Sequence, residues 1–322
     1  MLFGVHRAAS QAMSTPSARD ARKWLAMGVV GLFLVLALPF GTNAQSGRPK
    51  IYGISYVKVK MTDLDKAKAF YGGLLGLREG LDGCKGEPLP CFAVNPQQRV
   101  ELTHTATSDH GWYLAEIGLT TSDVAQMLKY LTARGVIASE MFRRTNGQEY
   151  FEVQDPETMK IVFEGVSGNS AEGKQNGQIS NKLFHAGFVV NDLKAEKAFY
   201  EDVLGFRLYW KGGFKDDGLD WYEIQVPDGN NWVEFMLNIP ANADHKELGV
   251  QNHFSLGVES ANAAAAKLRA AGAKEFDGPE VGRDGKNALD IYDPDWTRVE
   301  IMEFVPTGKP CCAEYTGPHP KP

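Results

Sequence analysis

The chain has 322 residues, of which 43% are hydrophobic and 23% are charged, and its formal net charge is −6. This ordinary globular composition is long enough for about two domains. A nucleic-acid-binding surface usually shows as a basic stripe, which this mildly acidic sequence lacks, so we expect no nucleic-acid partner.

The first 44 residues are predicted to be a secretory signal and not part of the fold. Basic residues between Arg19 and Lys23 precede an unbroken apolar run at 24–40, and a small-residue cleavage site ending at Ala44 follows. The run is slightly short for a membrane span of about 20 residues. We therefore expect cleavage and export to the periplasm or medium. The alternative is an uncleaved anchor, which is the only membrane contact that the sequence suggests.

Short motifs recur downstream and divide the chain into four units. Asp-Leu, Ala-Phe-Tyr and Leu-Gly follow one another from Asp63, and again from Asp192 with the same spacing. A later Asp-Pro pair begins at Asp155 and again at Asp293. Repetition of this kind indicates a fold built from copies of one structural unit.

Each unit is predicted to contain a strand, a helix and three further strands. The opening strands are apolar and span 54–59, 115–119, 184–190 and 253–258. The helices start at side chains that can cap them, Asp63 or Thr62 and Asp192 or Asn191. Glycines that can adopt a left-handed conformation follow the helices at Gly76, Gly135, Gly205 and Gly272. The expected fold class is α+β, with four βαβββ modules.

One module is too small to cover both faces of its sheet, so modules must pair. Short connections and a break rich in Ser, Gly, Asn and Gln favour pairing in sequence order. We expect a first domain at 51–166, a linker at 167–181, a second domain at 182–306 and an extended tail at 307–322.

This order of motifs resembles the vicinal oxygen chelate superfamily, which includes glyoxalases, bleomycin-resistance proteins and extradiol dioxygenases. The resemblance covers about residues 51–305. It implies two paired domains with cupped mixed sheets, each able to wrap a metal with ligands from the first and last strands of its modules.

Four residues of the second half are candidate ligands for one divalent metal ion. His185 and His253 lie in opening strands, and Glu234 and Glu300 follow a valine in the last strands of the same modules. Because side chains alternate along a strand, one residue from each strand can point into a shared cup. Buried imidazole and carboxylate groups need pairing or coordination. This set suits Zn, Ni, Fe, Mn or Co and leaves positions open for water or substrate. The alternative is half-buried histidines with glutamates facing solvent.

The first half lacks this set. Matching the repeats places Tyr56, Glu116 and Val162 where His185, His253 and Glu300 stand, and only the carboxylate at Glu101 matches Glu234. We expect a degenerate domain without a complete metal site.

The order His, Glu, His, Glu resembles glyoxalase I. That resemblance implies a lyase or isomerase that binds two vicinal substrate oxygens and stabilises an enediolate, with Glu300 or Glu234 as the base. An exported enzyme would act on a small oxo or hydroxy compound in place of a glutathione conjugate. One alternative is an extradiol ring-cleaving dioxygenase with non-haem iron on His185, His253 and Glu300, although the approach to the last strand has Tyr292 and no histidine. Another is a non-catalytic protein that binds a small molecule.

Three further residues share strand faces with the candidate ligands. Trp232 and Met236 lie two residues either side of Glu234 and can line a substrate pocket or belong to the core. Arg298 precedes Glu300 by two residues and can meet an anionic substrate or form a rim salt bridge. The Gly-rich loop that carries Arg283 and Lys286 can form a mobile lid.

The four cysteines fall in two close pairs. Cys84 and Cys91 share a loop and can form a disulfide in an oxidising compartment. Cys311 and Cys312 are adjacent, and neighbouring cysteines rarely bridge. This second pair can make a metal or redox contact or belong to a solvent-exposed tail, and we expect the exposed tail.

Overall fold

The computed structural model describes residues 47–80, 84, 90–106, 113–166 and 177–322. The predicted signal segment and most of the predicted linker lie outside these residues, so both stay predictions, as do the domain boundaries. No helix within the described ranges is long and apolar enough to cross a membrane.

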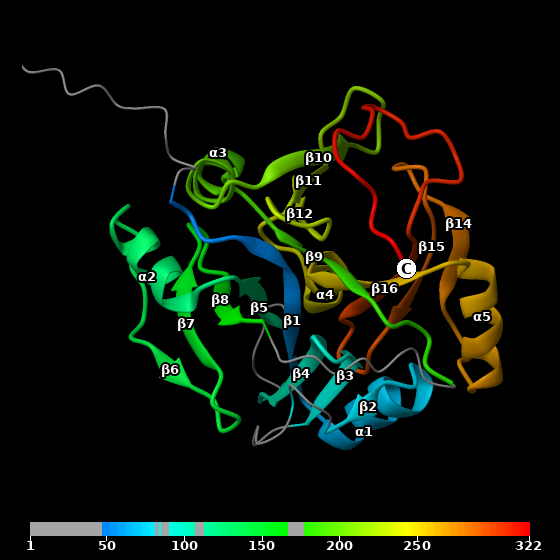
Figure 1. Ribbon diagram of the computed structural model, residues 1–322. Coiled ribbons are helices and arrows are strands. Elements are labelled where there is room, and N and C mark those ends of the chain that lie inside the picture. The colour runs from blue at the N-terminus through cyan, green and yellow to red at the C-terminus, as the bar shows by residue number, and fades with distance from the viewer. Residues whose placement is uncertain (1–46, 81–83, 85–89, 107–112, 167–176) are drawn as a thin grey trace, which may run out of the picture. The chain divides into compact units, whose positions relative to one another are not determined.

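Two eight-stranded mixed sheets form the fold, one from each half of the chain (Figure 1). The first sheet has, in spatial order, β2 (Arg78–Glu79), β3 (Cys91–Asn95), β4 (Gln98–His104), β1 (Ile51–Met61), β5 (Leu114–Thr121), β8 (Lys160–Gly165), β7 (Glu149–Gln154) and β6 (Phe142–Arg143). The second has β10 (Arg207–Gly212), β11 (Trp221–Gln225), β12 (Trp232–Met236), β9 (Leu183–Val189), β13 (His253–Val258), β16 (Arg298–Glu303), β15 (Asn287–Tyr292) and β14 (Asp277–Val281).

The opening strands of two successive modules meet at the centre of each sheet. Strands β1 and β5 pair antiparallel in the first sheet, and β9 and β13 pair antiparallel in the second. Each opening strand also pairs in parallel with the last strand of its own module, as β9 does with β12 and β13 with β16. The predicted α+β class, the βαβββ modules and the sequential pairing are confirmed.

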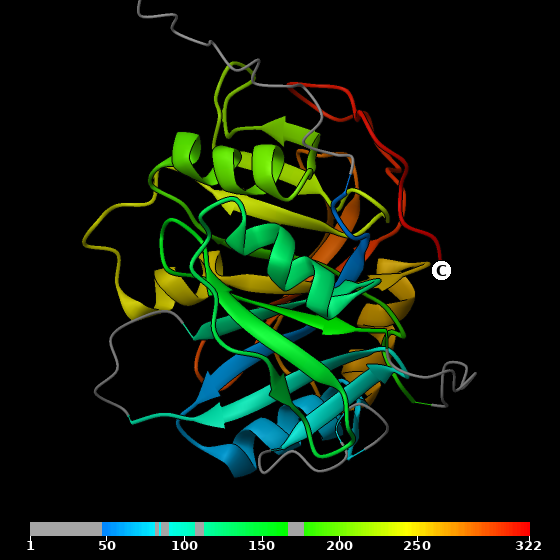
Figure 2. The same ribbon diagram turned by 60° about the vertical axis from the view of Figure 1, so that its left-hand side comes forward.

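The helices begin where the sequence predicts. Asp63 caps α1 (Leu64–Lys68) by accepting hydrogen bonds from two backbone amides, and Asp192 caps α3 (Leu193–Lys197) by accepting one. Each continues into a wider π-helical turn, η1 (Ala69–Leu74) and η2 (Ala198–Val203). The remaining helices are α2 (Val124–Thr132), α4 (His245–Gln251) and α5 (Ala261–Ala270). Helix α5 flanks β14, β15 and β16, and the short α4 connects the third and fourth modules (Figures 1 and 2).

The two halves share one hydrophobic core and exchange a reciprocal pair of hydrogen bonds. The hydroxyl of Tyr71 donates to Asp293 at 2.9 Å, and the hydroxyl of Tyr200 donates to Asp155 at 3.2 Å. Each tyrosine belongs to an Ala-Phe-Tyr motif and each aspartate to an Asp-Pro motif of the opposite half. The repeated motifs therefore join the halves as well as shaping each module.

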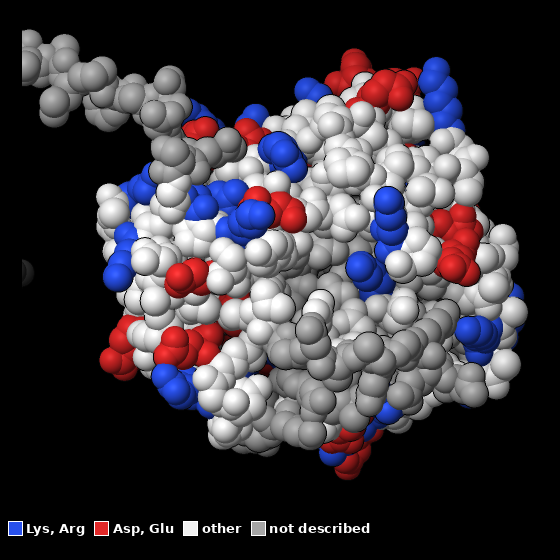
Figure 3. Space-filling model, viewed as in Figure 1, with Lys and Arg blue, Asp and Glu red and all other residues white. Residues whose placement is uncertain are grey.

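The C-terminal tail differs from the expectation. A disulfide joins Cys84 and Cys91, a pairing that the sequence left open, and a second disulfide joins the adjacent Cys311 and Cys312, which the sequence made less expected. The tail is not an isolated extension, because the ring of Tyr315 packs against the buried aromatic cluster beneath it. Adjacent cysteines can bridge here because the backbone of Cys312 adopts a left-handed φ of 68°. On the face shown in Figure 3, basic and acidic side chains are interspersed.

Candidate metal centre

Four adjacent strands at the centre of the second sheet each contribute one candidate ligand. In the strand register, Glu234 on β12 and His253 on β13 lie on either side of Gly187 on β9. His185 on β9 and Glu300 on β16 lie on either side of Ser255 on β13 in the same way. In each pair, one small residue on the strand between them separates the histidine from the glutamate. All four side chains therefore project from the same face of the sheet.

The four head groups converge. Nε2 of His185 lies 3.1 Å from Nε2 of His253 and 3.1 Å from Oε2 of Glu300. Oε2 of Glu234 lies 3.1 Å from Nε2 of His253 and 3.7 Å from Nε2 of His185. Ligand atoms of His185, His253 and Glu300 all lie within 4.8 Å of one another. The sequence therefore predicted which residues meet, and their role as metal ligands stays a prediction.

Burial sets the protonation of this cluster. Desolvation lowers the pKa of His185 to about 3 and holds the pKa of His253 well below its usual value, so both imidazoles are neutral at neutral pH. Desolvation also raises the pKa of Glu234 and of Glu300. Nδ1 of His253 lies 3.1 Å from the backbone carbonyl of Gln251, which favours a proton on Nδ1 and leaves the lone pair of Nε2 facing the centre.

The arrangement fits a divalent cation. Two neutral imidazole nitrogens face each other, and Oε2 of Glu300 is buried without a hydrogen-bond donor among the described residues. Buried polar atoms of this kind normally have a partner. Nitrogen and carboxylate donors on a rigid sheet are the set that first-row divalent metals bind, and a cation would satisfy these atoms together.

A cavity of about 380 Å³ opens onto the centre. Glu234 and Glu300 line it, and so do Met236 and Arg298, which the sequence suggested as substrate contacts. The guanidinium of Arg298 lies 3.4 Å from Asp290 and 2.9 Å from Nε2 of His253. Arg298 therefore forms a salt bridge and lines the cavity, and its contact with a substrate stays a prediction.

Trp232, which the sequence also suggested as a substrate contact, lies outside this cavity. Its indole is fully buried, does not line the cavity, and stacks on the ring of His185 with centroids 4.9 Å apart. The ammonium of Lys286 lies 4.6 Å from the indole centroid. Lys286 is itself fully buried and bonds Tyr315 at 2.7 Å, so it is not part of an exposed lid. Trp232 therefore supports the imidazole of His185 by stacking on it, and Lys286 contacts Trp232.

In the first half, ion pairs occupy the corresponding region of the sheet, and two of their carboxylates, Glu101 and Glu116, match ligand positions of the second half. The guanidinium of Arg99 is 2% exposed and bonds Glu164 at 2.8 and 2.9 Å and Glu101 at 2.7 Å. The ammonium of Lys58 lies 2.7 Å from Glu116. Cationic side chains of the chain itself therefore neutralise these buried carboxylates, where the second half has two histidines.

The sequence family described as "Glyoxalase/Bleomycin resistance protein/Dioxygenase superfamily" matches residues 53–163 and 182–301. The chain belongs to this superfamily. Each match falls within one half and covers both of its modules, so the degenerate first half is a superfamily domain as well.

Solved structures share the fold at low sequence identity. A variant of homoprotocatechuate 2,3-dioxygenase from Brevibacterium fuscum has a TM-score of 0.62 at 19% identity, covering 85% of this chain and 75% of its own. The 2,3-dioxygenase LapB from Pseudomonas sp. KL28 has 0.61 at 18%, covering 85% and 95%. A Mn(II)-bound glyoxalase from Novosphingobium aromaticivorans has 0.61 at 17%, covering 79% and 83%. No curated protein sequence matches this chain.

Sequence reasoning missed three residues that shape the centre. Gly187 leaves room for the imidazole of His253, and Gln251 orients that imidazole. Glu223 on β11 lies opposite Glu234, lines the cavity and is 3% exposed, and burial raises its pKa well above the usual value. The alternating pattern of β11 could have placed Glu223 on the ligand face once its register with β12 was known.

Proposed function

We propose that this chain is an exported, divalent-metal-dependent lyase or isomerase, which moves a proton between neighbouring carbon atoms of a small oxo or hydroxy compound, as glyoxalase I does. The observation that carries this proposal is the position of Glu234. Its carboxylate lies 3.1 Å from His253 and adds a second acidic ligand to His185, His253 and Glu300. The resemblance to glyoxalase I depends on the full set of two histidines and two glutamates, and Glu234 completes that set.

A divalent ion would be held by these four residues and would supply Lewis-acid polarisation of substrate oxygens. The chain's own residues supply the rest. Glu234 and Glu300 enter from strands on opposite sides of the histidine pair, so each can hold a proton on its own side of a bound substrate. Arg298 presents a positive charge to the same cavity, which favours a substrate with an anionic or strongly polar oxygen group.

A ring-cleaving dioxygenase is the second candidate. It is favoured by the close grouping of His185, His253 and Glu300, which is the two-histidine, one-carboxylate set of non-haem iron oxygenases. Tyr292, which the sequence offered for this chemistry, donates its hydroxyl to Asp277 at 2.7 Å and does not line the cavity. We therefore rank this reaction second.

Metal binding is tested first, with Mn²⁺ as the probe. Metal analysis of the purified mature protein identifies the resident ion, and titration followed by electron paramagnetic resonance gives the Mn²⁺ affinity. We expect His185→Ala and Glu300→Gln each to weaken binding by more than about tenfold. The exposed His104→Ala variant is the matched control and should bind as the parent does. A metal-free protein that takes up no Mn²⁺ would leave only a metal-independent binding role.

Two assays on the metal-loaded protein then separate the reactions. Incubation with 2-hydroxyketones and 2-oxo acids in D₂O should give deuterium at the carbon next to the carbonyl, detected by NMR, and Glu300→Gln should abolish it. Oxygen uptake with catechols reports the alternative. Catechol-dependent oxygen consumption without deuterium incorporation would replace the isomerase proposal with the dioxygenase.

Export is supported by the signal-like N-terminal sequence and by two disulfides, which persist mainly in oxidising compartments. Expression of the full chain in a bacterial host, followed by fractionation and intact-mass measurement, should give a periplasmic or secreted protein that starts at Gln45. A full-length product in the membrane fraction would instead establish the anchor, and a cytosolic product would contradict export.

A further inference from the structure

The disulfide between Cys311 and Cys312 holds a tight turn in the C-terminal tail. Cys312 has a φ of 68°, in the left-handed region that residues with a β-carbon rarely adopt. The amide of Ala313 donates to the carbonyl of Cys311 at 2.6 Å across this turn. The bond between the two sulfur atoms therefore constrains a backbone conformation that the free residues would favour little.

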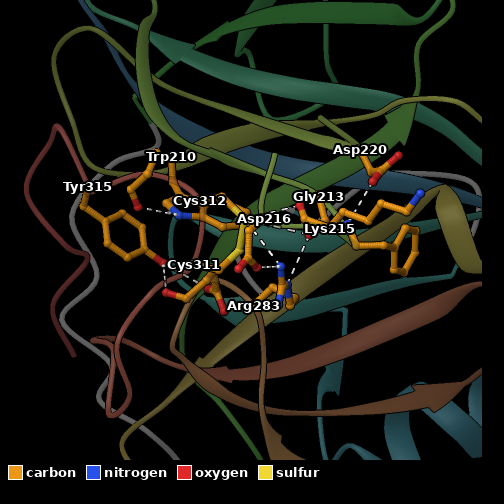
Figure 4. The surroundings of a disulfide bond; sticks show 12 residues. Trp210, Gly213, Lys215, Asp216, Asp220, Arg283, Cys311, Cys312 and Tyr315 are labelled. Atoms are coloured by element: carbon orange, nitrogen blue, oxygen red, sulfur yellow. Dashed lines mark hydrogen bonds and ion pairs between the residues drawn. A yellow bond between two sulfur atoms is a disulfide. The ribbon is translucent and has the colours of Figure 1, made fainter. Parts of the chain in front are cut away.

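A cation and an anion lie beside this disulfide (Figure 4). Sγ of Cys312 is 3.7 Å from Nη2 of Arg283 and within 3.9 Å of the carbonyl oxygens of Gly213 and Lys215. The same guanidinium nitrogen lies 2.6 Å from the carboxylate of Asp216. A thiolate formed at Cys312 would therefore be stabilised by Arg283, whereas Asp216 and the two carbonyl oxygens would weaken that stabilisation.

The two disulfides of the chain differ in access. Cys312 is exposed and Cys311 is half-buried, whereas Cys84 and Cys91 are 5% and 3% exposed. Thiol–disulfide exchange requires a thiolate to reach one sulfur atom, and the rate rises when the other sulfur is a good leaving group. Among the residues that the structure describes, only the C-terminal pair combines access with a cation beside one of its sulfur atoms.

We propose that Cys311 and Cys312 form a thiol-exchange site that takes low-molecular-weight thiols. A thiolate attacks Sγ of Cys311, the bond between Cys311 and Cys312 breaks, and its electron pair leaves on Cys312 beside Arg283. A second thiolate attacks the small-molecule sulfur of the mixed disulfide and releases Cys311. Two small thiols are oxidised to one disulfide, the protein pair gains two electrons, and the two thiol protons end on the cysteines. This chemistry is independent of the reaction proposed for the metal centre.

The exchange site also controls part of the cavity wall. The indole N–H of Trp210 donates to the carbonyl of Ala313 at 3.1 Å, and the amide of Cys311 donates to the carbonyl of Arg283 at 2.8 Å. Trp210 and Arg283 both line the cavity of the candidate metal centre. Reduction frees the turn from its covalent constraint, so it loosens the hydrogen bonds that position these two wall residues.

The first experiment measures which disulfide reacts and how fast. The mature full-length protein is incubated with reduced glutathione, alkylated at intervals and analysed by peptide mass spectrometry. We expect the C-terminal pair to be reduced before Cys84–Cys91, with the transient glutathione adduct on Cys311. Earlier reduction of Cys84–Cys91, or an adduct on Cys312 alone, would overturn the proposed site or its direction of attack.

Charge variants test whether Arg283 and Asp216 change the rate at which the C-terminal disulfide is reduced. Arg283→Gln should slow reduction by roughly two- to fivefold, and Asp216→Asn should accelerate it by a similar factor, as expected for exposed charges. Arg207→Gln, on the same sheet but away from the disulfide, is the matched control and should react at the parent rate. If the disulfide only stabilises the turn, all three variants should be reduced at the same rate. That result would contradict the proposed effect of Arg283 on the leaving sulfur.

Hydrogen exchange tests the link to the cavity. After reduction, amide exchange should increase in segments 209–216, 282–286 and 311–316 and stay constant in the strands that carry the metal ligands. The Cys311→Ser/Cys312→Ser double variant should show the same increase without added thiol. Unchanged exchange in both samples would restrict the site to the tail and overturn its control of the cavity wall.

Discussion

Gly187 lies between Glu234 and His253 on the neighbouring strands, and its missing side chain leaves room for an imidazole. A β-carbon at this position would lie 2.1 Å from Cε1 of His253. We predict that Gly187→Ala displaces the ring and weakens Mn²⁺ binding by more than about tenfold, because metal centres tolerate little movement of a ligand. Titration of the variant with Mn²⁺, followed by paramagnetic resonance, measures the effect.

Gly73→Ala is the matched control for this substitution. A β-carbon at Gly73 would meet nothing within 4 Å, so the variant should bind Mn²⁺ as the parent does. Circular dichroism should show the same fold for both variants. Parent-like Mn²⁺ affinity in Gly187→Ala would mean that the position of the His253 imidazole does not limit binding.

The four candidate ligands could be predicted from sequence because each lies at a repeated position and carries a metal-binding head group. The residues that orient them could not. Gln251 acts through its backbone carbonyl, which any residue possesses, and Gly187 acts through the absence of a side chain. Trp232 was placed on the correct strand face, but only the packing shows that it lies behind His185 and outside the cavity.

At the scale of elements, the hydroxyls of Tyr71 and Tyr200 each join a π-helical turn of one half to an Asp-Pro turn of the other. Both hydroxyls are buried, so removing one leaves its carboxylate partner with fewer donors. We predict that Tyr71→Phe and Tyr200→Phe each lower the free energy of unfolding by about 1–2 kcal/mol. Urea denaturation followed by fluorescence measures this change.

The exposed Tyr52→Phe variant controls for loss of a hydroxyl as such and should leave the unfolding free energy within about 0.5 kcal/mol of the parent. If Tyr71→Phe and Tyr200→Phe are equally neutral, the two bonds do not hold the halves together and the shared apolar core is sufficient.

Element types and order followed closely from the sequence, because apolar alternation, capping aspartates and glycines after helices are local signals. Gly76, which follows the π-helical turn η1, has the predicted positive φ of 67°. The π-helical turns and the packing of the tail were not predicted. The π-helical turns could not be predicted because a wider turn differs from an α-helix only by one hydrogen-bond register. The packing of the tail could not be predicted because it depends on an aromatic cluster, containing Trp232 and Tyr209, that is distant in sequence.

At the scale of the whole molecule, the two sheets surround their buried carboxylates with different partners. In the first, the cations of Arg99 and Lys58 compensate Glu164 and Glu116. In the second, Glu234 and Glu300 face two neutral imidazoles. Buried charge is costly unless it is paired or coordinated. The first half therefore pairs its buried carboxylates directly with its own cations. In the second half, Arg298 and Lys286 lower the pKa of Glu234 and Glu300 but form their ion pairs with Asp290 and Asp284.

The contact between the halves contains a third group of buried acids, and it makes stability depend on pH. Glu196 on α3 of the second half accepts a hydrogen bond from the amide of Glu157 in the first half, near Asp155. Burial, followed by repulsion from Asp155, raises the pKa of Glu196 to about 8 from 4.5. Between these two values the folded protein binds a proton that the unfolded chain has lost, so the contribution of Glu196 is present below about pH 4.5 and disappears as pH rises through 8.

The variant Glu196→Gln isolates this effect, because an amide keeps the acceptor and cannot ionise. The difference in unfolding free energy between variant and parent should move in favour of the variant by about 2 kcal/mol from pH 5 to pH 9, a value reduced from the full shift to allow for solvent screening. Urea denaturation at both pH values measures it, with the exposed Glu140→Gln as control. A difference that does not change with pH would mean that Glu196 is already ionised at pH 5. The contact between the halves would then hold a buried charge without losing stability.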